Sequence, residues 1–120
     1  RYLYYYLYDK LVESNGIKSL RYIHEHYSED ISISDLARLE NYNVSYYTDW
    51  FKKQTGSAPS HYIRKLRIDK AKELLTSTRY RLIDIAMQVG YAGNAAFSRA
   101  FRACEGVNPA QYRHAQWEEK

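Results

Sequence analysis

The sequence has few of the residues that break helices, staple small domains or cross membranes. Two prolines and five glycines in 120 residues are too few for a loop-rich fold. The single cysteine, Cys104, cannot form an internal disulfide, and no cysteine pair has the spacing of a metal site. No apolar run approaches the about 20 residues of a bilayer span, and the first residues do not resemble a signal peptide. We therefore expect a cytoplasmic protein without a membrane partner, and a chain that does not begin with methionine indicates a fragment of a longer protein.

The chain does contain material for a hydrophobic core and an uneven distribution of charge. It is 45% hydrophobic and 16% aromatic, which is sufficient for a core in one domain or two very small ones. The net charge is +4, but residues 1–40 hold five Lys/Arg against seven Asp/Glu, and residues 41–120 hold thirteen against seven. A basic second part favours a polyanionic partner, although composition alone fits a solvated charged surface equally well.

The strongest structural signal is an internal repeat. Four residues recur 50 positions later: Phe51, Gly56, Pro59 and Tyr62 as Phe101, Gly106, Pro109 and Tyr112. Four others recur 49 positions later: Asp35, Leu36, Ala37 and Tyr42 as Asp84, Ile85, Ala86 and Tyr91. The second copy therefore has one additional residue between its two halves. A repeat of this length predicts one supersecondary unit that occurs twice.

The first copy is predicted to be a helix, a short turn and a second helix. Ser32 and Asp35 form the pattern of a capping box, and the short helix carrying Leu36, Ala37 and Leu39 should end near Asn41. Asn43 is suited to cap the second helix, and Gly56 to end it in the left-handed conformation. The predicted buried face of this second helix has the spacing i, i+3, i+4, i+7: Tyr47, Trp50, Phe51 and Gln54.

The second copy follows the same pattern. Its short helix should bury Leu82, Ile85, Ala86 and Val89 and end at Gly90. Its second helix should bury Phe97, Ala100, Phe101 and Cys104 and end at Gly106. Cys104 is thus expected to pack in the core rather than to react.

The remaining segments are also predicted to be helical, and they define the expected domain organisation. A connector helix from Pro59 to about Thr76 would be about 27 Å long, with apolar residues at Tyr62, Ile63, Leu66, Ala71, Leu74 and Leu75. Further helices are expected at Ile17 to Tyr27 and from Pro109. The fold class is all-α, with two helix-turn-helix subdomains and about seven helices plus a leader helix. The expected segments are a leader (1–16), a first subdomain (17–58), the connector (59–78) and a second subdomain (79–120).

The outward faces of the second helix in each copy indicate DNA binding. A helix-turn-helix can place its second helix in the major groove. With the buried positions removed, the first copy presents Ser45, Tyr46, Thr48, Asp49, Lys52 and Lys53, and the second presents Asn94, Ala95, Ser98, Arg99 and Arg102. Short polar side chains can reach base edges, while Lys52, Lys53 and Arg102 near the helix ends can contact phosphates. The alternative for either helix alone is an ordinary solvated surface.

From Ser32 to Arg113 the sequence resembles the DNA-binding domain of bacterial AraC/XylS-type transcription regulators. The residues that carry the resemblance are Asp35-Leu36-Ala37, Trp50-Phe51-Lys52-Lys53, Gly56, Pro59, Tyr62, Leu66-Arg67, Ala71, Leu74-Leu75, Ile83-Asp84-Ile85-Ala86, Gly90-Tyr91, Phe97-Ser98-Arg99, Phe101-Arg102, Gly106, Pro109 and Tyr112-Arg113. The resemblance implies a seven-helix fold whose two recognition helices enter successive major grooves on one face of double-stranded DNA.

The resemblance also implies which residues read bases. The usual base-reading positions of the family fall on Ser45, Thr48, Asp49, Asn94, Ala95, Ser98 and Arg99. Asp49 stands where many relatives have arginine, so it either accepts from a cytosine amino group or repels phosphate and pairs with a neighbour. Gly93 and Ala95 replace residues that are commonly polar, which predicts a weaker cap on the second recognition helix and leaves Ala95 to contact a thymine methyl group.

An enzyme is the first alternative, and the histidines are where it would have to begin. His24 and His26 are two positions apart on a helix and so point in different directions, unsuited to sharing a metal. His61 and His114 lie near the two prolines without a recognisable nucleophile and carboxylate. We therefore expect no enzyme activity, no catalytic or metal site and no cofactor.

A protein-interaction module is the second alternative, and it is compatible with DNA binding. The chain opens with Tyr2, Leu3, Tyr4, Tyr5, Tyr6, Leu7 and Tyr8, which would be apolar nearly all round if helical. We interpret this segment as a link to an absent N-terminal sensor or dimerisation domain. The isolated module is then expected to be a monomer, and RNA polymerase is a candidate partner.

Overall fold

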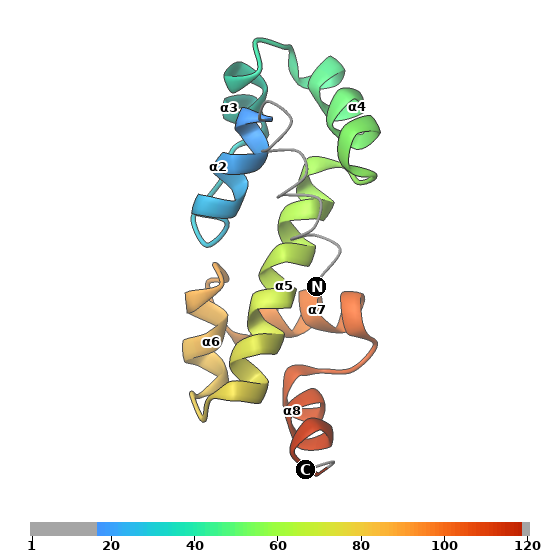
Figure 1. Cartoon of the computed structure of the whole chain (residues 1–120). Helices are drawn as coiled ribbons and strands as arrows, with labels where there is room; N and C mark the ends of the chain where they lie inside the picture. The colour runs from blue at the N-terminus through green and yellow to red at the C-terminus, as the bar shows by residue number, and fades with distance from the viewer. Residues whose placement is uncertain (1–16, 119–120) are drawn as a thin grey trace. The chain divides into compact units, whose positions relative to one another are not determined.

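A computed structural model describes residues 17–118 of the chain. The leader expected at 1–16, with its leader helix, lies outside the described residues. Over the described range the chain forms seven helices and no strands, so the all-α prediction is confirmed (Figure 1). The chain divides into two compact units, of which the first ends at Leu66 and the second begins at Arg67.

The first unit contains three helices and the beginning of a fourth. These are α2 (Lys18–His26), α3 (Ile33–Leu39), α4 (Val44–Thr55) and the first part of α5 (Pro59–Ser77). They surround a core of Ile17, Leu20, Ile23, Leu36, Ala37, Tyr47, Phe51, Tyr62, Ile63 and Leu66. Tyr47 and Tyr62 lie at ring-centroid distances of 5.7 and 5.6 Å from Phe51. This aromatic cluster fixes α4 against the beginning of α5.

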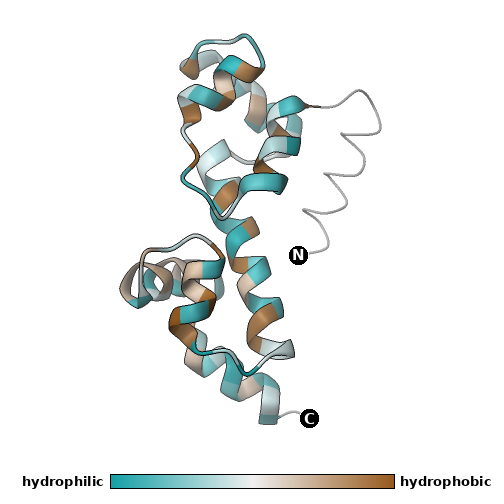
Figure 2. Cartoon of the chain, turned by 90° about the vertical axis from the view of Figure 1, so that its left-hand side faces the viewer, coloured by the Kyte–Doolittle hydropathy of each residue, from teal (hydrophilic) through white to brown (hydrophobic). Residues whose placement is uncertain are grey.

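The second unit has the same plan. After the remainder of α5 it contains α6 (Leu82–Gln88), α7 (Asn94–Glu105) and α8 (Pro109–Glu118). Its core consists of Ile68, Ala71, Leu75, Ile85, Ala86, Val89, Phe97 and Phe101, with Cys104 packed against it as expected. Phe97 and Tyr112 lie 5.8 and 5.4 Å from Phe101, in the same arrangement as the aromatic cluster of the first unit. Figure 2 shows hydrophilic and hydrophobic residues alternating along the same helices.

The turns of the two units repeat in backbone detail. After α3, Asn41 adopts a φ of 62°, and the amide of Tyr42 donates to the carbonyl of Ala37. After α6, Gly90 adopts a φ of 106°, and the amide of Tyr91 donates to the carbonyl of Ala86. Both are Schellman-type ends. The turns span residues 40–43 and 89–93, which confirms the additional residue in the second copy.

The predicted ends of α4 and α7 are confirmed, and one predicted capping motif is wrong. Gly56 and Gly106 end the two helices with φ values of 90° and 81°. Ser32 precedes α3, but its side chain makes no capping hydrogen bond. Asp35 instead pairs with Arg38 on the same helix. The acid still lies in the first turn, where the helix dipole favours it, but a neighbouring guanidinium has replaced the reciprocal backbone contacts.

One predicted core position is wrong, and three buried residues were not predicted. Gln54 is exposed, whereas Thr55 is buried at the end of α4. Burial of Thr55 is possible because its hydroxyl donates to the carbonyl of Phe51 and lies 3.3 Å from the amide nitrogen of Ser57. In α5, Ile68 and Asp69 are buried although neither was assigned to the core.

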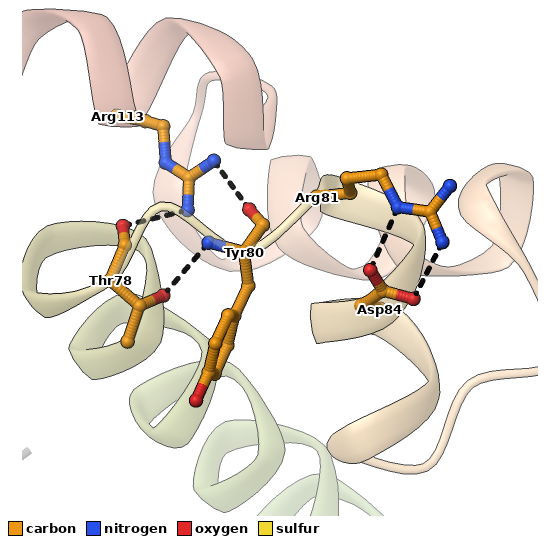
Figure 3. Close-up of polar contacts among 5 residues, drawn as sticks. All are labelled: Thr78, Tyr80, Arg81, Asp84 and Arg113. Atoms are coloured by element: carbon orange, nitrogen blue, oxygen red, sulfur yellow. Dashed lines mark hydrogen bonds and ion pairs between the residues drawn. The ribbon is translucent and has the colours of Figure 1, made fainter.

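Each unit contains its own set of polar contacts between residues far apart in the sequence. In the first, the Glu40 carboxylate accepts from the amide and the hydroxyl of Ser19, at 2.9 and 2.8 Å, and so holds the beginning of α2. In the second, the guanidinium of Arg113 donates to the carbonyls of Leu75, Tyr80 and Thr78, at 3.1, 2.7 and 3.2 Å. Figure 3 shows Arg113 reaching the segment that links α5 to α6. Each set of contacts holds the segment that precedes the helix-turn-helix of its own unit.

Candidate nucleic-acid interface

The exposed face of α4 begins with a well-ordered first turn. The side chain of Asn43 accepts a hydrogen bond of 2.8 Å from the amide of Tyr46, which confirms the predicted cap. The ring of Tyr46 is 56% exposed. It packs at a tilt against Tyr42, with ring centroids 4.6 Å apart, and Tyr42 in turn contacts Trp50 at 5.3 Å. Tyr42 was not among the expected site residues, yet it holds the Tyr46 ring in place.

The middle of α4 carries the polar residues expected to face DNA. Ser45 and Asp49 are exposed, and Thr48 is half-buried. The Thr48 hydroxyl donates to the Val44 carbonyl at 2.9 Å, so its proton is already used within the helix. Lys52 and Lys53 are exposed in the last turn. The structure therefore brings the expected residues of the first copy onto the solvent-accessible side of one helix.

The exposed face of α7 has a different beginning and a different charge. Its N-cap, Gly93, makes no side-chain capping bond. This confirms the prediction that α7 is capped less well than α4. Asn94, Ala95, Arg99 and Arg102 are exposed, and Ser98 is half-buried. A hollow of about 360 Å³ adjoins the two arginines and is lined by Leu82, Ser98, Arg99, Arg102, Asn108, Pro109 and Ala110. Its rim contains two cations and no acid.

The charged residues of these two faces are not paired within the protein. Between residues 17 and 118, the side chains of Asp49, Lys52, Lys53, Arg99 and Arg102 take part in no hydrogen bond or ion pair. Some other exposed charges are paired, since Asp35 pairs with Arg38 and Arg81 pairs with Asp84 through two contacts. Figure 3 shows the second of these pairs, at the beginning of α6. Both α4 and α7 thus carry unpaired charged side chains that a charged ligand could bind.

The Asn-Pro sequence before α8 marks a cap that the sequence analysis did not assign. The amide of Asn108 donates to the side chain of Gln111, and the amide of Gln111 donates to the side chain of Asn108, at 3.0 and 2.8 Å. This is a reciprocal capping arrangement. It fixes the residues that form one wall of the hollow beside Arg99 and Arg102.

All four histidines have side-chain partners within the protein. His24 makes a hydrogen bond of 2.6 Å with the Tyr62 hydroxyl, and His26 one of the same length with Glu29. His61 contacts Arg64 at 3.0 Å, and its partial burial lowers the pKa of its ring, as do Arg64 and Lys65. His114 pairs with Glu118. Across the described part of the chain, no three metal-binding side chains form a cluster, and no described helix is long and apolar enough to span a bilayer.

Comparison with known proteins identifies similar helix-turn-helix proteins. A helix-turn-helix domain family model matches residues 36–115. The HTH-type transcriptional regulator YobQ of Bacillus subtilis (strain 168) is 36% identical over 115 residues, which covers 96% of this chain and 47% of the relative. The chain therefore spans less than half the length of this relative.

Solved structures of similar fold include DNA-binding and response-regulator domains. The C-terminal domain of AraT, a response regulator from Geobacillus stearothermophilus, superposes with a TM-score of 0.77 at 35% identity, covering 82% of each chain. The DNA-binding domain of the global transcriptional factor AdpA, solved with a target DNA, superposes with a TM-score of 0.80 at 26% identity. That alignment covers 86% of this chain and 93% of the other.

Proposed function

Because the chain belongs to the AraC-type family of helix-turn-helix domains, we propose that it reads a bipartite DNA site, with α4 and α7 in successive major-groove segments, and so regulates transcription. The observation that carries the proposal is the coincidence of the repeat with the unpaired charges. Two copies of one helix-turn-helix each expose a second helix, and each of those second helices carries charged side chains without a partner among the described residues.

The residues have different roles in this proposal. Those proposed to contact base edges are Ser45, Tyr46, Thr48, Asp49, Asn94, Ala95, Ser98 and Arg99. Lys52, Lys53 and Arg102 lie late on their helices, where they would contact flanking phosphates. The hollow beside Arg102 is large enough to admit a phosphate group.

The connector supports a bipartite site. The helix α5 continues without interruption over 19 residues, which corresponds to about 28 Å of helix axis. One turn of DNA is about 34 Å, or 10 to 10.5 base pairs. We therefore propose that two units joined by this continuous helix bind half-sites separated by about one turn. A single chain would then bind a non-palindromic sequence.

The whole protein would place this reader in a bacterial transcription regulator at the nucleoid. The curated relatives are longer than this chain, so we propose that a further N-terminal domain supplies sensing or dimerisation. The 120-residue chain by itself should sediment as a monomer and bind no small effector. RNA polymerase remains a candidate partner of the complete regulator.

A helical-phasing experiment tests the bipartite site. A site selected from random DNA would be prepared with zero, five or ten base pairs inserted between its halves. Five base pairs place the second half on the opposite side of the helix, so affinity should fall to that of a single half-site. Ten restore the face but separate the halves by two turns, which a connector of about 28 Å cannot span, so affinity should stay at that of a single half-site. Full affinity with five inserted base pairs would show that one unit alone binds.

A further inference from the structure

We propose that Asp49 sets the base preference of the first half-site by accepting a hydrogen bond from a cytosine amino group and rejecting guanine. The inference rests on the proposed function, because it assumes that α4 enters the major groove. It adds the chemistry by which the two recognition helices would read different sequences. The evidence is the position of Asp49, its lack of partners and the chemistry of the base edges.

Asp49 lies on the side of α4 that faces away from the core. Tyr47 and Phe51 are fully buried, and Asp49 is two residues from each. Two residues correspond to about 200° of helical rotation, so its side chain leaves the helix opposite these two rings. Asp49 is accordingly exposed. A helix seated in the groove with its core side outward would direct this carboxylate toward the base pairs.

The carboxylate has no partner within residues 17–118, although suitable cations are close in sequence. Lys52 and Lys53 occupy positions i+3 and i+4, the spacing at which helical ion pairs form, yet neither pairs with Asp49. The aspartates at the beginnings of α3 and α6 are both paired with arginine. Asp49 is therefore a free hydrogen-bond acceptor rather than a member of a surface ion pair.

The base edges discriminate strongly against a carboxylate except at cytosine. In the major groove guanine presents two acceptors, thymine an acceptor and a methyl group, and adenine an acceptor beside its donor, whereas cytosine presents its amino donor. A carboxylate can only accept. Repulsion from the guanine acceptors and from adenine N7 leaves cytosine as the compatible base. The neighbouring Thr48 hydroxyl donates within the helix, so it does not provide a competing donor.

The second recognition helix carries the opposite chemistry at the equivalent position. Arg99 follows Asp49 by 50 residues, and a guanidinium can donate to both guanine acceptors. The two copies thus present an acceptor and a donor from one backbone framework. This arrangement would make the two half-sites different in sequence and would prevent the protein from binding in the reverse orientation equally well.

The test compares base preferences of the 120-residue chain with those of Asp49 variants. Duplexes would be selected from a random pool, and each position of the first half-site would then be changed to all four base pairs. We expect one position where cytosine is preferred to guanine by about five- to 100-fold. Asp49→Ala should remove that preference alone, and Asp49→Asn should shift it toward adenine.

A matched control separates specificity from net charge. Glu25→Ala removes one exposed negative charge from α2 of the same unit and should leave every base preference unchanged. Asp49→Ala should also bind unselected DNA about two- to threefold more tightly at low salt, because one charge that repels phosphate is absent. Equal tightening on all sequences, with the cytosine preference retained, would overturn the inference while leaving DNA binding intact. A chain that selects no sequence at all would overturn both this inference and the proposed function.

Discussion

The two helix-turn-helix units share a framework and differ at several positions that α4 and α7 expose. Phe51 and Phe101 make equivalent ring contacts in the two cores, and Gly56 and Gly106 end the helices in the same conformation. In contrast, Asp49 in the middle of α4 corresponds to Arg99 in α7. The residues that repeat are those that fold the chain, whereas those that diverge lie where a ligand would bind.

The units also differ in how each helix-turn-helix is held. Glu40 orders the beginning of α2 in the first unit, and Arg113 orders the α5–α6 link in the second. Arg113 also lies over the ring of Trp117, as does Arg79, each at 5.0 Å. Burial and the nearby Arg79 lower the pKa of Arg113, whose guanidinium is still charged at neutral pH. The second unit thus depends on one long-range cation.

The largest effect is expected from removing that cation. Arg113→Ala would leave three backbone carbonyls without their charged donor, and partial exposure reduces the penalty to about 3 kcal/mol of unfolding free energy. Glu40→Gln keeps an acceptor for Ser19 and should cost about 1 kcal/mol. Denaturant titration with tryptophan fluorescence would measure both changes. If both variants lost the same unfolding free energy, the contacts of Arg113 and of Glu40 would not differ in strength as proposed.

Sequence reasoning predicted the repeat, the helix ends and most of each core because these depend on local spacing. Asn43, Gly56 and Gly106 are recognised from their own conformational preferences. The role of Arg113 could not be predicted from local spacing. Its carbonyl partners are 33 to 38 residues away in the sequence, and Arg113 entered the sequence analysis only through the family resemblance. The Ser32 capping box was wrong because Asp35 has an alternative partner, Arg38, that the motif does not consider.

At the candidate interface, too, the side-chain contacts could not be predicted from local spacing. Helical periodicity places Asp49 on an outward face, but it does not say whether Lys52 or Lys53 neutralises it. That depends on side-chain conformation, and the structure leaves Asp49 unpaired among the residues it describes. Tyr42 was visible as a repeated residue, yet its support of Tyr46 depends on the path of the turn at Asn41.

The comparison of α4 with α7 can be sharpened at Arg99. If this arginine reads guanine, Arg99→Ala should cost roughly 1 to 3 kcal/mol of binding free energy on the selected site and relax one base position of the second half-site. Lys52→Ala serves as the control on α4, because loss of a phosphate contact should weaken all sequences alike and reduce the salt slope by about one. Fluorescence anisotropy at several salt concentrations measures both. A loss from Arg99→Ala that is equal on random DNA would make it a phosphate contact.

The smallest expected effect concerns the caps of the two recognition helices. Asn43 accepts from the amide of Tyr46, whereas Gly93 offers no side chain to α7. Gly93 has an extended backbone, with φ −176°, and a Cβ there would meet no atom within 4 Å. Gly93→Asn should therefore stabilise the chain by about 0.5 kcal/mol, and Asn43→Ala should destabilise it by about 1 kcal/mol. Gly93→Ala is the matched control, because it restricts the unfolded chain in the same way but supplies no oxygen for the cap. Thermal unfolding should rank Asn above Ala at this position. If the two variants unfold at the same temperature, the missing cap is not a real difference between α4 and α7, and their contrast is confined to the residues proposed to contact DNA.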